Sequence, residues 1–159
     1  MLAYKFLGHD GIGLISGFKW PRDRWVEVEG PLVSTLNGIH GCHLDDLSYW
    51  IDSELWTVEF AGATIDGEHA VVAACGRLVE KIEEWNSDAS GEFTEVCADR
   101  NRGLGPADAA AGWVPDAGAA YVAAHAAGLE AESRGESYDA GFVAERRWQS
   151  HWLAERLGL

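Results

Sequence analysis

The sequence has few basic residues and no long apolar run. Its 159 residues include 12 Lys and Arg against 26 Asp and Glu, which gives a formal net charge of -14. This charge repels phosphate backbones and anionic lipids, so we expect neither a nucleic-acid partner nor a membrane partner. No apolar stretch approaches the roughly 20 residues that a membrane span needs, and the N-terminus leads directly into a strand pattern. These absences predict a cytoplasmic protein.

Cysteine is also scarce. Cys42, Cys75 and Cys97 are widely spaced and odd in number, and no second cysteine stands at CxxC spacing. This pattern argues against a disulfide framework and against a closed zinc site. We therefore expect reduced thiols and no bound metal, and no motif in the sequence identifies a cofactor.

The length and a 47% hydrophobic content are enough for one ordinary core, so we predict a single domain over residues 1–159. The character of the chain changes near Trp85. Residues 1–85 alternate Gly, Pro and aromatics with short apolar runs, whereas residues 86–159 are Ala-rich with helical spacing. The predicted class is α+β: an N-terminal mixed or antiparallel sheet with one short helix, followed by about three C-terminal helices packed on it.

Three segments of the first half show strand patterns. Residues 3–7 have the pattern of an opening strand, and residues 25–29 alternate apolar and acidic side chains. Residues 54–60 give the best signal, because Trp56, Val58 and Phe60 would point to one face of a sheet.

Other segments of this half are less regular. Residues 8–17 are Gly-rich and predict a loop, whereas residues 44–51 have the apolar spacing of a short helix. Residues 71–85 fit either a helix or a strand, and we favour a strand that continues past Gly76.

The second half predicts three helices. Ser87 caps the first, which ends at a break over Gly103 to Pro106. The second runs from Asp116 through Ala131 and the third from Ser137 through Leu157, with Gly135 and Gly158 closing them. The spacing of the third helix assigns its solvent-facing side to Glu145, Arg146, Gln149 and Arg156.

The densest group of reactive side chains is His40, Cys42 and His43. On an extended backbone, His40 and Cys42 project to the same side. An imidazole beside a thiol can activate a nucleophile or ligate a soft metal, but a buried structural cysteine is also common. We favour His40 as the functional residue, because Gly38 and Gly41 on either side of it leave space for a ligand to approach. A histidine bonded within the fold is the alternative.

Several further residues could line a pocket with an aromatic wall and few polar groups, the usual form of a small-molecule site. Each of them alone is better explained by packing. We assign possible catalytic roles to His40, Cys42 and Glu59, and possible ligand contacts to Tyr4, Lys5, Trp20, His43, Tyr49 and Trp56.

Parts of the chain resemble a group of small proteins of actinobacteria and their phages that share a GIHxC segment. This resemblance implies kinship but no particular reaction. It is carried by Tyr4-Lys5-Phe6-Leu7, Gly17-Phe18-Lys19-Trp20-Pro21 and Gly38-Ile39-His40-Gly41-Cys42.

A looser likeness concerns the run from Gly38-Ile39-His40 to Tyr49-Trp50. It is similar to the segment that follows the NAD-binding strand of ADP-ribosyltransferase-like folds, with His40 where those folds have Tyr. The likeness implies NAD as cofactor, Tyr4 or Lys5 as a contact to NAD, and Glu59 as the catalytic acid.

Three functions remain open. The first is a small cytosolic enzyme or small-molecule-binding domain with a pocket around His40, where this residue would be a general acid/base or a hydrogen-bonding group. The second is an NAD-dependent ADP-ribosyltransferase-like enzyme. The third is a non-catalytic interaction module whose acidic surface binds a protein partner.

Overall fold

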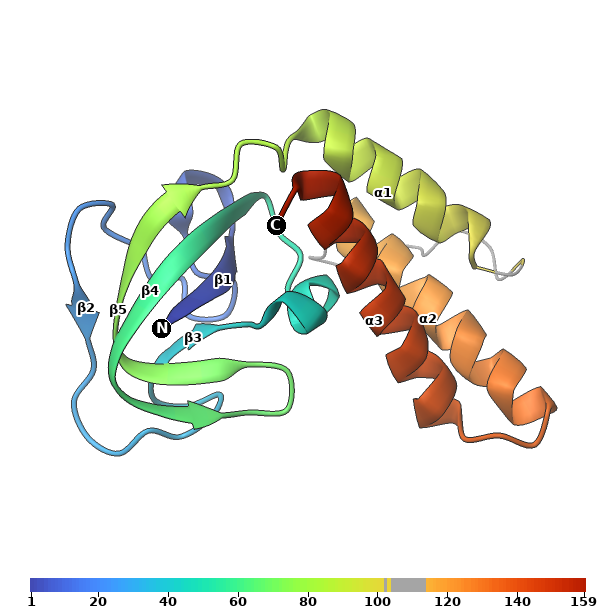
Figure 1. Ribbon diagram of the computed structural model, residues 1–159, viewed down its shortest axis with the longest axis horizontal. Coiled ribbons are helices and arrows are strands. Elements are labelled where there is room, and N and C mark those ends of the chain that lie inside the picture. Colours follow the sequence, from blue (N-terminus) through green and yellow to red (C-terminus); the bar gives the residue numbers. More distant parts are fainter. Residues whose placement is uncertain (102, 104–113) are drawn as a thin grey trace.

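The computed structural model describes residues 1–101, 103 and 114–159. Within these ranges, a curled antiparallel sheet lies beside three helices (Figure 1). The predicted α+β class, with the sheet first and the helices after it, is confirmed. The predicted break over Gly103 to Pro106 lies largely outside the described residues.

The sheet has five strands in its described part, and all of their pairings are antiparallel. Their order is β1-β4-β5-β2, and β3 also pairs with β5. The strand predicted at 54–60 continues six residues further, and the ambiguous segment at 71–85 is a strand over most of its length. The strands are β1 (Leu2–Leu7), β2 (Val26–Glu27), β3 (Ile39–Gly41), β4 (Glu54–Asp66) and β5 (Val71–Lys81).

Two short 3₁₀ turns accompany the sheet. The first, η1 (His9–Gly11), lies at the start of the Gly-rich segment, which is otherwise a loop as predicted. The second, η2 (Leu44–Tyr49), stands where the sequence predicts a short helix.

The sheet curls until its first strand meets β3. The backbone N–H and C=O of Tyr4 in β1 bond to the C=O and N–H of Cys42, which follows β3, at 2.9 and 2.7 Å. Gly41 allows this approach, because a Cβ there would lie 2.8 Å from both the Phe60 ring and the Tyr4 carbonyl oxygen. The closure brings the beginning of the chain against residues 38–42.

The two faces of the curled sheet have different neighbours. On β1, Phe6 points into a core shared with the helices, whereas Ala3 and Leu7 belong to a second core inside the curl. Because side chains alternate along a strand, Lys5 shares the inner face with Ala3 and Leu7. A lysine is thereby placed on an apolar surface formed also by Trp20 and Phe60.

The helices are α1 (Ser87–Asp99), α2 (Pro115–Ser133) and α3 (Tyr138–Leu157). Two predicted starts are corrected by the structure. Asn86, not Ser87, caps α1, since its side chain accepts from two backbone N–H groups of the first turn. Pro115 begins α2 ahead of Asp116, in the first-turn position that proline favours.

The predicted solvent-facing side of α3 is wrong for three of its four residues. Glu145, Arg146 and Gln149 are only 3%, 6% and 0% exposed, because α3 packs against α2, η2 and α1. Two of these side chains bond to main-chain carbonyls in the interior: Arg146 donates to the Ser48 carbonyl at 2.9 Å, and Gln149 donates to the Ala120 carbonyl at 2.9 Å. Helical spacing shows which residues share a face but not whether that face is covered.

Candidate functional site

A pocket of about 390 Å³ opens on the inner side of the curled sheet. Its walls come from residues 4–6 of β1, the loop 13–20, residues 26–28 and residues 35–42. The lining is mainly apolar, and its polar side chains include those of Lys5, Glu27 and His40. An apolar hollow with a few polar groups is the usual form of a small-molecule site.

Lys5 lines this pocket from β1. Its Nζ donates to the main-chain oxygen of His40 at 2.6 Å and lies 5.0 Å from the centre of the Trp20 ring. In the part of the chain that the structure describes, no carboxylate lies within 4 Å of this nitrogen. Burial lowers the pKa of Lys5 from 10.5 to about 8, against an opposing effect of Cys42. Lys5 is thus a partly neutral amine near physiological pH.

His40 lines the pocket with its ring half-buried. Its Nε2 accepts the backbone N–H of Thr35 at 3.0 Å, so the lone pair that a general base would use is already engaged. Burial and then the charge of Lys5 lower the pKa of His40, while a hydrogen bond to the Gly38 backbone opposes the shift. The neutral ring holds the loop that forms one lip of the pocket.

The bond to His40 matters because Thr35 has a φ of 69°, a left-handed conformation that costs energy for a β-branched residue. We expect His40→Ala to lower the free energy of unfolding by about 1 kcal/mol, the usual contribution of one hydrogen bond. Amide hydrogen exchange at Thr35 should become faster. His43→Ala is the control, because His43 is exposed and its nearest carboxylate, Asp66, is 3.9 Å away. Unchanged exchange at Thr35 would show that the ring does not hold this loop.

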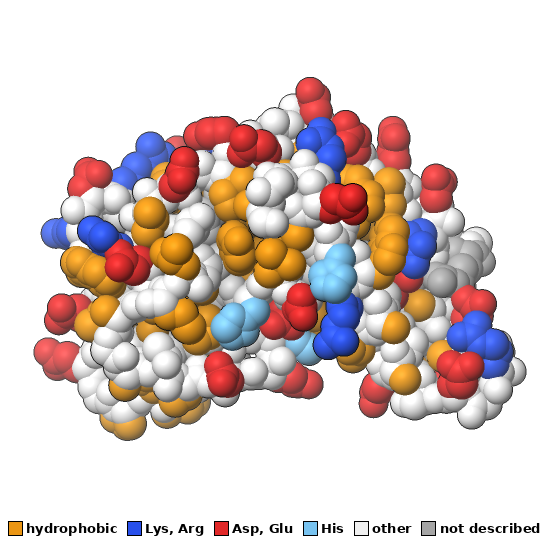
Figure 2. All heavy atoms as spheres, in the orientation of Figure 1, with side chains coloured by type: hydrophobic (Ala, Val, Ile, Leu, Met, Phe, Trp, Pro, Cys, Tyr) orange, Lys and Arg blue, Asp and Glu red, His pale blue; other side chains and the backbone are white. Residues whose placement is uncertain are grey.

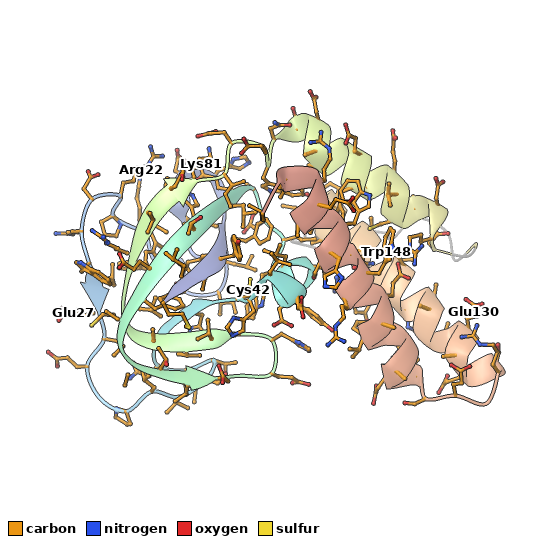
Figure 3. All side chains as sticks on the ribbon, viewed as in Figure 1. Arg22, Glu27, Cys42, Lys81, Glu130 and Trp148 are labelled. Atoms are coloured by element: carbon orange, nitrogen blue, oxygen red, sulfur yellow. The ribbon has the colours of Figure 1, made fainter. Side chains whose placement is uncertain are left out.

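Cys42 contributes its backbone rather than a reactive thiolate. The residue is 1% exposed, and burial, followed by the charge of Asp46, raises the pKa of its thiol well above the ordinary range. Figure 3 shows Cys42 between the curled sheet and the helices. Its main chain closes the sheet against Tyr4, which is a structural role.

The structure brings more than half of the predicted site residues to one place. All of these line the pocket, and all come from the opening strand, the following loop and the GIHxC segment. They are Tyr4, Lys5, Trp20, His40 and Cys42.

Glu59 and Trp56 lie outside the pocket lining. The Glu59 carboxylate accepts hydrogen bonds from Nη2 and Nε of Arg77 at 2.6 and 2.7 Å. The two side chains form an ion pair on the sheet. Trp56 is buried in the inner core, and its Nε1 donates to the Glu54 carboxylate at 3.0 Å. The ADP-ribosyltransferase likeness implies that Glu59 lies beside the ligand, whereas Glu59 does not line this pocket.

His43 and Tyr49 also lie apart from the pocket lining. His43 is exposed, whereas Tyr49 stacks on His69 with their ring centres 3.7 Å apart. The guanidinium of Arg146 lies 5.0 Å from the centre of the Tyr49 ring. Tyr49 therefore belongs to the contact between η2 and α3.

Sequence reasoning missed the apolar rim of the pocket. Leu14, Ile15, Phe18 and Leu36 line it, yet they are 55%, 77%, 44% and 83% exposed. The available signal was a set of large apolar residues, Leu14, Ile15 and Phe18, in and directly after the Gly-rich segment, which a plain surface turn does not need. Such a rim extends the apolar surface that a ligand meets.

Other classes of site have less support. Among the described residues, no group of three or more His, Cys, Asp or Glu side chains could hold a metal ion. No described helix has the length and apolar character that crossing a membrane requires. Comparison with protein-family models, curated proteins and solved structures gives no match.

Proposed function

We propose that this protein binds a small, mainly apolar molecule that carries one polar group, in the pocket between β1, β3 and the loop 13–20. The observation that carries the proposal is the position of Lys5, a lysine without a carboxylate partner among the described residues in an otherwise mainly apolar hollow. A buried amine lowers stability unless something compensates for its desolvation. A ligand group that accepts from Lys5 supplies such compensation.

The acidic surface favours a neutral ligand over an anionic one. Figure 2 shows acidic side chains spread over both the sheet and the helical parts of the visible face. The net charge of -14 repels anions in solution, and the apolar rim favours an uncharged molecule.

The proposal includes a cytoplasmic location, since Cys42 and Cys97 are free thiols buried in the fold, as is usual for cytosolic proteins.

Filling the pocket should weaken binding. The probe is N-phenyl-1-naphthylamine, a neutral dye whose fluorescence rises in apolar sites, titrated into the full chain. We expect saturable binding to the wild type, weakened about tenfold or more by Val28→Trp, because an indole at this lining position takes the ligand's volume. Val79→Trp is the matched control, since Val79 is 51% exposed on β5 and outside the pocket lining.

Thermal melting separates a blocked pocket from a misfolded protein. A second filling variant, Ser16→Phe at an exposed lining position of the loop 13–20, should also weaken dye binding while it keeps the wild-type melting temperature. If the wild type shows no saturable signal, or if both filled variants that fold bind as tightly as Val79→Trp, the pocket is not the binding site.

A further inference from the structure

The lysines of this chain, at positions 5, 19 and 81, have three different environments. Lys81 lies 3.8 Å from the carboxylates of both Glu54 and Glu83, and Lys19 is exposed to solvent. Lys5 instead meets a peptide carbonyl and an indole ring inside the pocket. In Figure 3, Lys81 lies well away from Cys42, the backbone partner of β1. Only Lys5 combines an apolar environment with access from a cavity.

The hydrogen bond to His40 orients the amine. A neutral amine has two N–H groups and one lone pair, and Lys5 directs one N–H to the His40 carbonyl oxygen at 2.6 Å. The ring of Trp20 limits the motion of the side chain on another side. The lone pair is then available to a molecule in the cavity, which is the arrangement that an amine nucleophile needs.

We propose that Lys5 forms a reversible imine with an aldehyde bound in the pocket. This inference rests on the proposed function, since it assigns the polar group of the bound molecule. A carbonyl compound fits the site because it is uncharged while it passes the acidic surface and the apolar rim. A carboxylate would have to overcome the net negative charge.

The reaction balances without any additional reactant. The lone pair of neutral Lys5 forms an N–C bond to the carbonyl carbon, and a proton moves from nitrogen to oxygen to give a carbinolamine. Loss of the hydroxyl with a proton releases one water and leaves the C=N bond. No group is oxidised or reduced, and addition of water reverses the sequence.

The environment of Lys5 supports this chemistry at neutral pH. Since burial lowers the pKa of Lys5 to about 8, about one tenth of this amine is neutral at pH 7. An ordinary lysine with a pKa near 10.5 is about 300 times less often neutral at that pH. Lys19, in water, provides an internal comparison within the same chain.

Reductive trapping tests the proposal. The full chain is incubated with octanal and sodium cyanoborohydride at pH 7, and intact mass and peptide mapping locate each octyl group. We expect the first adduct on Lys5, forming at least about tenfold faster than on Lys19 or Lys81. Lys5→Met should lose the fast adduct, whereas Lys81→Met should keep it. Because Lys5 and the α-amino group of Met1 lie on the same N-terminal peptide, fragment ions of that peptide assign each octyl group to one of the two amines.

Binding controls distinguish failure of this inference from failure of the pocket. Octanol, which cannot form an imine, should displace N-phenyl-1-naphthylamine and slow the labelling of Lys5. If octanal displaces the dye but labels Lys5 no faster than Lys19, the imine is excluded and the pocket remains. If octanoate displaces the dye better than octanal and Lys5 is not labelled faster, Lys5 is a counter-ion instead. If no dye binds and Lys5 is not labelled, both proposals fail.

Discussion

Replacing Phe93 with alanine is expected to lower the free energy of unfolding by about 4 kcal/mol, as for large aromatic side chains removed from well-packed cores. Phe93 is 0% exposed on α1. Its ring packs against Trp85 and Trp152, with ring centres 6.3 and 5.6 Å apart. Trp85 in turn packs edge-on against Phe6 of β1, with a distance of 5.7 Å between ring centres. Phe93 therefore connects the sheet to the last helix.

The same contacts predict that residues 1–85 and 86–159 unfold together. One buried cluster draws residues from β1, η2, β4, α1, α2 and α3, so neither half keeps its apolar surface buried without the other. Urea unfolding followed by far-ultraviolet circular dichroism and by tryptophan fluorescence should give coincident single transitions.

An exposed position supplies the control for Phe93→Ala. Val143→Ala on α3 removes a side chain at a residue that is 41% exposed, so its effect should stay within about 0.5 kcal/mol. A Phe93→Ala effect below about 1 kcal/mol, or two separated transitions in the wild type, would contradict a shared core.

The strands could be predicted where alternation is strong. In β4, Trp56, Val58 and Phe60 do share one buried face, because a period of two places alternate residues on one side of any strand. The register of β4 against β5 contains irregularities, after Thr57 and after Ala61, and these depend on pairing that no local pattern records.

The candidate site could be predicted only in part, because its residues come from distant segments. Tyr4 and Lys5 were expected to line a pocket, and Cys42 to lie near His40. The closure that joins these segments depends on backbone bonds between Tyr4 and Cys42, and sequence spacing does not show such bonds. Sequence spacing also does not show that the backbone N–H of Thr35 donates a hydrogen bond to Nε2 of His40.

Lys5 is the residue whose role changes most once its surroundings are known. A lysine in a strand pattern usually extends to water along an exposed face. Here the alternation of β1 puts it inside the curl, where Trp20 and Phe60 supply apolar surface. Its lowered pKa is therefore a property of the closed fold and should be absent from the unfolded chain.

That difference predicts how stability depends on pH. Between about pH 8 and pH 10.5 the unfolded chain keeps a proton on Lys5 that the folded chain has released, so unfolding takes up a proton and stability rises with pH. Relative to Lys5→Met, the wild type should gain about 2 kcal/mol between pH 7 and pH 9.5. At pH 7, Lys5→Met should be more stable than the wild type by about 2 kcal/mol, because removing the desolvated amine outweighs the lost bond to His40.

Urea unfolding at pH 7 and pH 9.5 measures both effects. Lys19→Met is the control, because Lys19 is exposed and lies outside the pocket lining, so its removal should change stability by no more than about 0.5 kcal/mol. Should Lys5→Met be less stable than the wild type at both pH values, with a constant difference, then Lys5 remains a fully charged and well-solvated residue. A gain in stability on removal of Lys5, together with loss of octanal labelling, is the combination expected of a side chain whose energetic cost is retained for binding.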